Sequence, residues 1–152
     1  MVSVLFVCLG NICRSPLAEA AFRAEAERLG LEVEVDSAGT GDWHLGHAPD
    51  KRAQAVALRN GMDISAYRAR QVERIDFMRF DHIIALDESN VTNLHAMRPE
   101  DASAAISLLL DHVPGREGEA VADPYYGDDA GFDVTWADVV AGAQGLVERL
   151  RR

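Results

Sequence analysis

The sequence predicts an α/β fold: a single three-layer domain over residues 1–152, with a central four-stranded parallel sheet flanked by helices on both faces. Strand-like segments alternate with helix-like segments along the chain, which is typical of βαβ units. The first strand-like segment, Val2–Val7, is an apolar run, as expected for a parallel strand buried on both faces. The 152 residues contain no internal repeat, low-complexity tract or linker, and this length fits one domain.

The first predicted helix begins at Ser15-Pro16, because serine is a common N-cap and proline favours the first helical position. Its apolar residues recur at intervals of three or four, and Gly30 is expected to end it. These apolar residues are Ala18, Phe22, Ala26 and Leu29. The following segment, Leu31–Asp36, alternates apolar with acidic residues and predicts the second strand.

The rest of the chain continues the alternation. Pro49–Leu58 predicts a helix, His82–Leu86 the third strand and Ala105–Leu110 the fourth, with a helix starting at Asp87 between these two strands. A final helix is marked by apolar residues at helical spacing, with the first of them assigned to the core: Trp136, Val139, Val140, Ala143, Leu146, Val147 and Leu150.

In folds of this class, ligands bind beyond the carboxyl ends of the strands. Three polar residues are predicted to meet at that edge of the sheet: Cys8, Ser37 and Asp87. We expect Asp87 to position Arg14 or the loop after the first strand from behind, to cap the helix that follows Asp87, or to do both. Asp50 and Arg52 are expected to cap a helix and form a structural ion pair rather than touch a substrate.

Composition excludes several classes of function. The formal net charge of −10 at pH 7 disfavours nucleic acid or an anionic membrane as a general partner. No basic leader and no apolar run of membrane-spanning length are present. Two cysteines at this spacing form neither a disulfide framework nor a zinc motif, and no carboxylate or cysteine pattern accompanies His44 and His47. We therefore expect a cytoplasmic protein with reduced thiols and no metal.

The segment after the first strand has the character of an anion-binding loop. Its backbone amides can surround one point, towards which the next helix directs the positive end of its dipole. The pattern is not that of a nucleotide-binding loop. Arg14 offers a planar fork that can hold two oxygens of a phosphate, and Ser15 can hydrogen-bond a sulfur atom. The predicted loop consists of Leu9, Gly10, Asn11, Ile12 and Cys13.

Cys8 stands at the start of this loop. The amides, the helix terminus and Arg14 would stabilise a thiolate there, so we expect Cys8 to be ionised at neutral pH and to attack phosphorus. A covalent thiophosphate would form and be hydrolysed by water. Taken alone, a cysteine at a strand end is more often an inert buried thiol, but the C-x5-R-S pattern reverses that preference and favours the nucleophile. Cys13 could form a reversible disulfide with an oxidised Cys8, or it could be a small loop residue.

Cleavage of a phosphate ester also needs a proton donor for the leaving oxygen. The best candidate is Asp123 in the segment Asp123-Pro124-Tyr125-Tyr126-Gly127, where two adjacent aromatic residues could line a slot for a flat ring. The alternative for Asp123 is a solvated turn residue. Trp43 is a large apolar residue in a predicted loop, and it could pack against the domain.

The sequence resembles the low-molecular-weight protein tyrosine phosphatase family over essentially its full length. The matching segments are Cys8–Pro16, Asp36–Thr40, Ala69–Gln71, Asp87–Asn90 and Asp123–Tyr126. The resemblance implies that Cys8 is the nucleophile, Arg14 the phosphate and transition-state binder, and Asp123 the general acid and base. It further implies that Ser37 holds the loop-shaping Asn11, that no cofactor is needed, and that the partner is a phosphotyrosine-containing protein whose ring is surrounded by Trp43, Tyr125 and Tyr126.

One position departs from the family pattern. Many members have a histidine where this chain has Tyr67, in the network around the loop asparagine. Tyrosine cannot carry a positive charge near neutral pH, so the support of Asn11 is expected to differ here.

Three rival functions make different demands on the sequence. A thioredoxin-coupled arsenate reductase needs cysteines in the middle of the chain, and none follow Cys13. A protein-arginine phosphatase on the same scaffold would have threonine in place of Ile12 and would lack the paired tyrosines. A non-catalytic phosphate-binding protein would not need Cys8, Ser15 and Asp123 together. The sequence does not indicate an oligomeric state.

Overall fold

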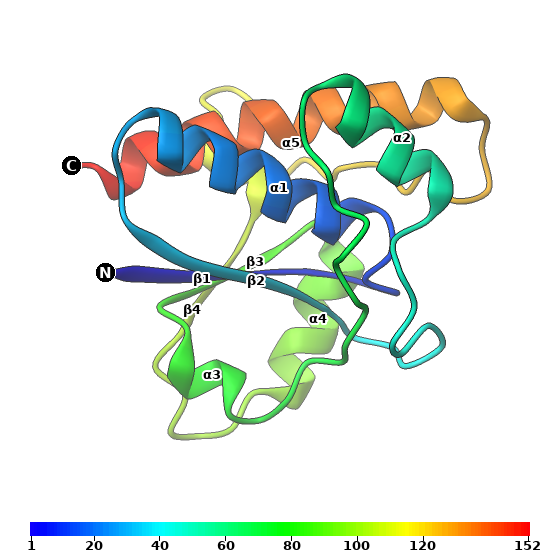
Figure 1. Ribbon diagram of the computed structural model, residues 1–152. Coiled ribbons are helices and arrows are strands. Elements are labelled where there is room, and N and C mark those ends of the chain that lie inside the picture. The colour runs from blue at the N-terminus through cyan, green and yellow to red at the C-terminus, as the bar shows by residue number, and fades with distance from the viewer.

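The computed structural model describes residues 1–152 and has the predicted three layers, with one four-stranded parallel sheet in the middle (Figure 1). The strand order is β2-β1-β3-β4, so the chain starts in the centre of the sheet and crosses over to each side. The strands are β1 (Val2–Cys8), β2 (Val33–Gly39), β3 (His82–Ala85) and β4 (Ala105–Leu108).

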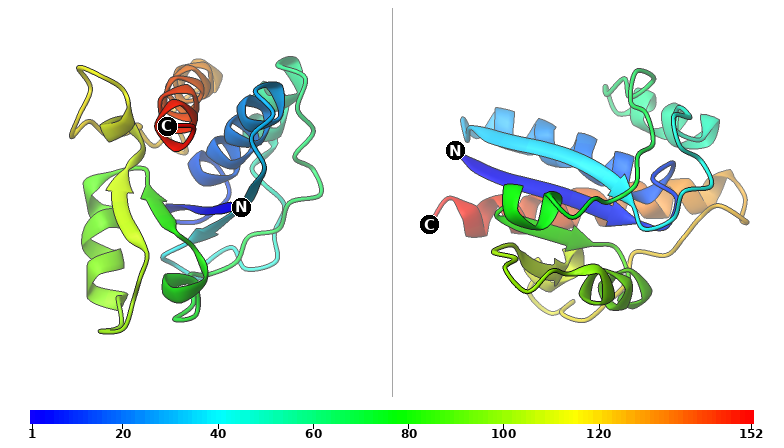
Figure 2. Two further views of the ribbon diagram at one scale, coloured as in Figure 1. Left: turned by 90° about the vertical axis from the view of Figure 1, so that its left-hand side faces the viewer. Right: turned by 90° about the horizontal axis from the view of Figure 1, so that it is seen from below.

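Helices cover both faces of the sheet, as the two further views confirm (Figure 2). One face carries α1 (Arg14–Arg28), α2 (Lys51–Arg59) and the long α5 (Asp129–Leu150). The other carries the short α3 (Asp76–Arg79) and α4 (Glu88–Met97). The helices do not combine the length and apolar composition needed to cross a membrane.

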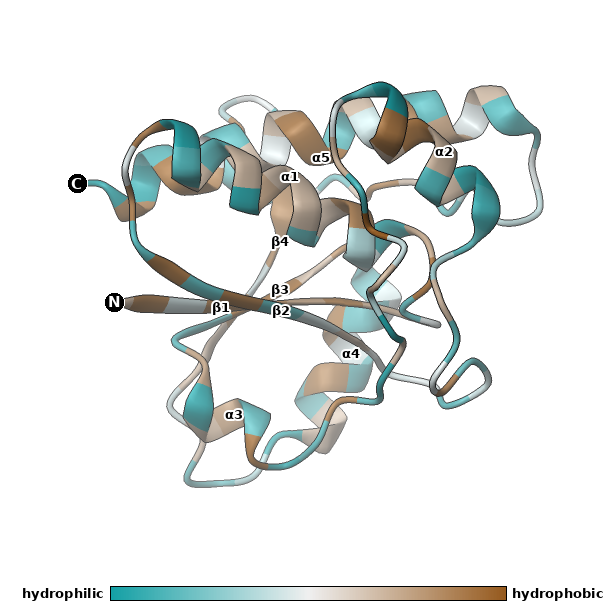
Figure 3. Ribbon diagram, in the orientation of Figure 1, coloured by the Kyte–Doolittle hydropathy of each residue, from teal (hydrophilic) through white to brown (hydrophobic).

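The apolar run of β1 divides its side chains between two hydrophobic cores. Val4 and Phe6 pack in the larger core under α1, α2 and α5, whereas Leu5 and Val7 pack in the smaller core with α3 and α4. Successive side chains of a strand point to opposite faces, so a strand covered on both sides must be apolar throughout. Figure 3 shows hydrophobic colour along much of β1 and hydrophilic colour on the outer turns of α2.

The predicted start of the first helix is wrong. The helix begins at Arg14 with Cys13 as its N-cap, and no side chain caps it. Ser15 is fully buried inside the first turn, where its hydroxyl serves the loop described below. Pro16 still fits, because the first turn of a helix has no intrahelical partners for its N–H groups.

Several element boundaries also differ from prediction. The second strand runs to Gly39 rather than Asp36, because it stays paired with β1 in register up to Cys8. The fourth strand ends at Leu108, where the Asp111 carboxylate accepts a hydrogen bond from the Leu108 N–H and starts a 3-10 helix, η1 (Leu109–His112). The sequence analysis missed η1 and α3. It also placed Trp136 in the core, whereas this residue is only partly buried against it.

Candidate active site

A pocket of about 390 Å³ opens at the carboxyl end of β1, at the sheet edge where the sequence predicted a site. Three loops meet there: the loop between β1 and α1, the loop after β2, and the loop before α5. Most of the predicted site residues line it, and they are joined by His44, which the sequence analysis did not select. The lining residues are Cys8, Leu9, Gly10, Ile12, Cys13, Arg14, Trp43, His44, Asp123, Tyr125 and Tyr126.

Cys8 is the last residue of β1 and is buried at the floor of the pocket. Its sulfur lies 3.0 Å from the Ser15 hydroxyl oxygen. That oxygen also accepts a hydrogen bond from Asn11 Nδ2 at 2.8 Å. Because an amide nitrogen can only donate, Ser15 keeps its own proton available for the sulfur. The network therefore arranges Ser15 to donate a hydrogen bond to a Cys8 thiolate.

Asn11 shapes the loop, as the resemblance implied. Its backbone has φ of 58°, the left-handed conformation that asparagine tolerates better than most residues. Its side chain donates to Ser15 and, at 3.0 Å, to Ser37, and it accepts from the Arg70 backbone N–H at 3.0 Å. Three elements thus hold one turn of the loop in place. Tyr67 makes no hydrogen bond to Asn11 and lies beside Glu19 and Arg23 instead.

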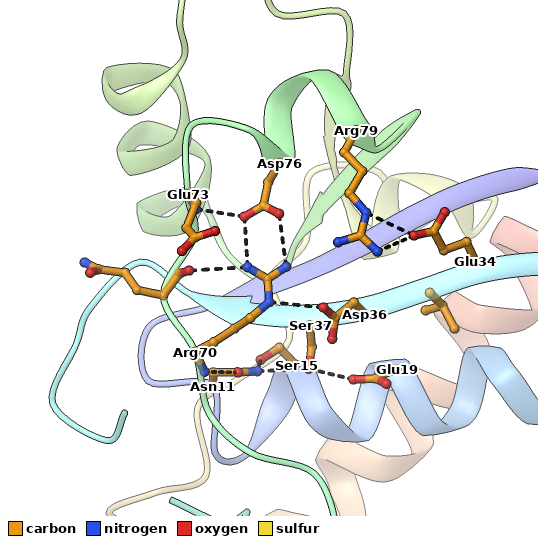
Figure 4. Close-up of polar contacts among 12 residues, drawn as sticks. Asn11, Ser15, Glu19, Glu34, Asp36, Ser37, Arg70, Glu73, Asp76 and Arg79 are labelled. Atoms are coloured by element: carbon orange, nitrogen blue, oxygen red, sulfur yellow. Dashed lines mark hydrogen bonds and ion pairs between the residues drawn. The ribbon is translucent and has the colours of Figure 1, made fainter. Parts of the chain in front are cut away.

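The buried carboxylate of Glu19 is also part of this network (Figure 4). Ser37 donates a hydrogen bond to Glu19 Oε1 at 2.7 Å, and Glu19 is paired in turn with Arg23. Burial raises the pKa of Glu19, against the hydrogen bonds from Arg23 and Ser37. Glu19 was missed by the sequence analysis, although an acid flanked by alanines on an otherwise apolar helix turn is a usable signal.

Arg70 is held in place by two carboxylates. Its guanidinium bridges Asp36 and Asp76, and Asp76 is only 1% exposed (Figure 4). Because the backbone N–H of the same residue holds Asn11, these two carboxylates fix the segment that supports the loop. By contrast, the Arg74 side chain is exposed.

Arg14 is buried beside Cys8, with its guanidinium fixed from behind. Nη1 donates to Asp87 Oδ2 at 2.7 Å and to the Val121 carbonyl at 3.0 Å. Asp87 also caps α4, so both of its expected roles are confirmed. Burial alone would lower the pKa of Arg14. The charge of Cys8 and the bonding and charge of Asp87 outweigh burial and raise that pKa, so the guanidinium stays charged.

Asp123 reaches the pocket from the loop before α5. Its Oδ2 lies 3.6 Å from Arg14 Nη2, and its side chain is 44% exposed. The carboxylate, the guanidinium and the Cys8 sulfur therefore surround the same small space. A tetrahedral dianion could bind between the loop amides and Arg14, with the sulfur below it and the carboxyl group at its side.

Comparison with known proteins agrees with the resemblance found in the sequence. A family model described as low molecular weight phosphotyrosine protein phosphatase matches residues 3–152. The chain belongs to this family. The protein-tyrosine-phosphatase YfkJ of Bacillus subtilis, a family member, is 47% identical, covering 100% of this chain and 97% of the relative. The chain is thus an enzyme of the protein-tyrosine-phosphatase class.

Solved phosphatase structures share the fold. The crystal structure of a protein tyrosine phosphatase from Entamoeba histolytica superposes with a TM-score of 0.93 at 34% identity, covering 99% of this chain and 97% of the other. A crystal structure described as a Drosophila arginine phosphatase superposes with a TM-score of 0.92 at 30% identity, covering 98% of each chain. The predicted fold class is confirmed.

The rim of the phosphatase pocket is aromatic. Trp43 is 68% exposed and its ring lies against Gly41, where a β-carbon would come within 1.8 Å of it. Tyr125 and Tyr126 pack edge to face with ring centroids 4.9 Å apart, and Tyr126 is 95% exposed. Packing against the core would bury rings of this size. The alternative that Trp43 packs against the domain therefore does not fit its exposed position.

Cys13, the second thiol of the phosphatase, is buried next to the loop. Burial raises its pKa, and the nearby charges of Asp50, Cys8 and Asp123 raise it further. Its thiol is therefore protonated near neutral pH. Both cysteines are free, and a disulfide between them stays a prediction. No group of three or more histidine, cysteine, aspartate or glutamate side chains is arranged to hold a metal ion.

Proposed function

We propose that this phosphatase hydrolyses phosphotyrosine in proteins, and small aryl phosphates, through a cysteinyl-phosphate intermediate. The supporting observation is that the Cys8 sulfur, the Arg14 guanidinium and the Asp123 carboxylate line one pocket at the carboxyl end of β1. Cys8 acts as the nucleophile, Arg14 binds the phosphate and the transition state, and Asp123 is the general acid and base.

In the first step the Cys8 thiolate attacks phosphorus opposite the ester oxygen. The new S–P bond forms as the P–O bond to the aryl group breaks. Asp123, in its protonated form, gives its proton to the departing oxygen. Arg14 and the loop amides hold the equatorial oxygens, whose charge they neutralise without a proton transfer.

In the second step Asp123, now a carboxylate, removes a proton from water as the water oxygen attacks phosphorus. The S–P bond breaks, inorganic phosphate forms, and the sulfur leaves as a thiolate. Asn11 donates a hydrogen bond to the Ser15 oxygen, so the Ser15 hydroxyl proton is free to point towards the sulfur. A hydrogen bond from this hydroxyl stabilises the leaving thiolate. The free enzyme is then restored.

The aromatic rim favours an aryl ester over an alkyl ester. Trp43, Tyr125 and Tyr126 line the same pocket as the buried sulfur, where they can contact the ring of a phosphotyrosine. Ile12 gives this pocket a further apolar wall. A phosphoserine side chain is shorter and has no ring to stack on these residues.

Substrate class is tested with three matched peptides that carry phosphotyrosine, phosphoserine or phosphoarginine in the same sequence. We expect kcat/KM for phosphotyrosine to exceed that for phosphoserine by about 30-fold, because two aromatic contacts of about 1 kcal/mol each lower the barrier by about 2 kcal/mol. Phosphate release is measured, with Cys8→Ser as the inactive control. A preference for phosphoarginine would assign the activity of the Drosophila neighbour instead. Binding of these peptides without release of phosphate from any of them would indicate a non-catalytic phosphate-binding protein.

The acid role of Asp123 is tested with Asp123→Asn, which keeps the shape of the side chain but has no proton to give. We expect kcat/KM to fall by about 10²–10³-fold for phenyl phosphate, whose leaving oxygen needs a proton. For 2,4-dinitrophenyl phosphate, whose leaving group is stable as an anion, the change should stay below about threefold. Equal losses on the two substrates would remove Asp123 from this role.

A further inference from the structure

The segment that carries Asp123 has few hydrogen bonds to the rest of the protein. In residues 123–127, Asp123, Tyr126 and Gly127 are exposed and Pro124 is buried, and a hydrogen bond from the Gly127 N–H to the Pro124 carbonyl at 3.0 Å closes the turn. Every hydrogen bond that joins residues 123–127 to another part of the chain is donated by one side chain, that of Arg52. A catalytic acid on a turn of this kind needs an external support to hold its geometry.

Arg52 lies on α2 and holds the turn at two points. Its Nη2 donates to the Tyr125 carbonyl at 2.9 Å, and its Nη1 donates to the Gly127 carbonyl at 3.0 Å. The guanidinium also stacks over the buried ring of Phe132, 4.6 Å from its centroid. A planar group with a fixed fork of donors suits this position, whereas a lysine ammonium would reach one carbonyl at a time.

Asp50 fixes Arg52 and connects it to the phosphate-binding loop. The Asp50 carboxylate is paired with Arg52 at 3.1 Å and caps α2. The backbone N–H of Asp50 donates to the Ile12 carbonyl at 2.9 Å. A two-residue bridge therefore runs from the loop that holds the phosphate to the loop that holds the acid.

The same bridge also reaches the residue that hydrogen-bonds the Asp123 carboxyl group. Asp123 Oδ1 accepts a hydrogen bond from the Tyr125 N–H at 3.1 Å, so the orientation of the carboxyl group follows the backbone of Tyr125. Arg52 binds the carbonyl of this same residue. The other oxygen, Oδ2, then faces Arg14.

We infer that Arg52 is a positioning residue for the general acid: it holds residues 123–127 so that the Asp123 carboxyl group faces the phosphate bound at Arg14. The inference rests on the proposed acid role of Asp123. The sequence analysis assigned Arg52 to a structural ion pair, and that pair exists. The ion pair is one half of the bridge, and the two carbonyls of the acid loop are the other half.

The test compares Arg52→Gln with Arg59→Gln. Arg59 is a matched control because it lies on the same helix and ties α2 to α5 through Asp133, 2.8 Å away, without touching the acid loop. We expect Arg52→Gln to lower kcat/KM for phenyl phosphate by about 10–100-fold, since a small misplacement of a catalytic group has effects of this size. For 2,4-dinitrophenyl phosphate the change should be less than about threefold. Arg59→Gln should leave both values within about twofold.

A double-mutant cycle with Asp123→Asn separates positioning from general damage. If Arg52 acts through Asp123, adding Arg52→Gln to Asp123→Asn lowers kcat/KM for phenyl phosphate no further. Fully additive losses, or equal losses on both substrates, would overturn the inference. If Asp123→Asn alone shows no dependence on the leaving group, the acid role fails first, whatever Arg52 does.

Arg52→Lys keeps the test decisive if Arg52→Gln folds poorly. Lysine retains the charge next to Asp50 and the stem over Phe132, but it can reach only one carbonyl. We expect partial recovery of phenyl phosphate turnover relative to Arg52→Gln, with inhibition by inorganic phosphate unchanged. Full wild-type turnover in Arg52→Lys would show that the two-point grip on the loop is not required, and would also overturn the inference.

Discussion

Replacing Cys8 by serine is expected to abolish turnover of aryl phosphates while phosphate binding persists. The loop amides, the helix terminus and Arg14 remain, so the anion site is intact. A serine hydroxyl is a far weaker acid than a thiol, and no histidine or other base lies within hydrogen-bonding distance of this position, where the only side-chain partner is Ser15. We expect kcat to fall by about 10⁵-fold or more, as for other nucleophile deletions.

Two measurements test the expected loss of turnover and the retained phosphate binding of Cys8→Ser. Phosphate release from an aryl phosphate is followed over hours, and binding of inorganic phosphate is followed by calorimetry. Rapid quenching of the wild-type enzyme with labelled substrate should trap a phosphorylated protein, which the variant should not form. Turnover in the variant within about tenfold of wild type would mean that Cys8 is not the nucleophile.

Replacing Arg14 by lysine is expected to lower kcat/KM by about 10³-fold or more, the scale seen when an arginine that stabilises a phosphoryl transition state is removed. Lysine keeps a positive charge, so this loss isolates the value of the planar fork. The guanidinium uses Nη1 to bind Asp87 and Val121 and leaves Nη2 on the side of the pocket. An ammonium group drawn to Asp87 has no second nitrogen left for the phosphate.

Vanadate, which mimics the five-coordinate transition state, provides the second readout for Arg14→Lys. Its affinity should fall in parallel with kcat/KM, whereas the affinity for inorganic phosphate should fall less. Arg79→Lys is the matched control: Arg79 pairs with Glu34 and stacks on Phe80, far from the pocket. An Arg14→Lys variant within about tenfold of wild type would mean that charge alone, without the fork, supports the reaction.

Local patterns in the sequence were enough to predict the nucleophilic loop. Cys8, Arg14 and Ser15 lie within eight residues, between an apolar strand and a helix, so the chain itself brings them together. The strand β1 could also be predicted, because a strand that is covered on both faces of a sheet needs a continuous apolar run. Two roles were predicted for Ser15, a helix N-cap and a hydrogen bond to a sulfur atom, and the structure agrees only with the second. Ser-Pro is a common helix start, but here the hydroxyl is engaged by Asn11 and Cys8.

Charged residues distant in the sequence were the hardest to interpret. Arg70 and Asp76 were indistinguishable from surface residues in a chain with 25 acidic residues, and Glu19 attracted no attention. In the structure the carboxylates of Glu19 and Asp76 are buried, and each is paired with an arginine. Burial of a charge is tolerated only with a partner, and a partner that is distant in sequence is found only when the chain has folded.

The sequence by itself therefore determined the alternation of strands and helices, the loop proposed to bind phosphate and the sulfur proposed to attack it, because each depends on neighbours along the chain. Only the tertiary structure decided how Asp123 is presented to that loop and that Arg52 carries the connection. These contacts join α2, the first loop and the turn before α5, and their geometry is set by packing between elements. A pattern of residues along one segment holds no information about the distance to another.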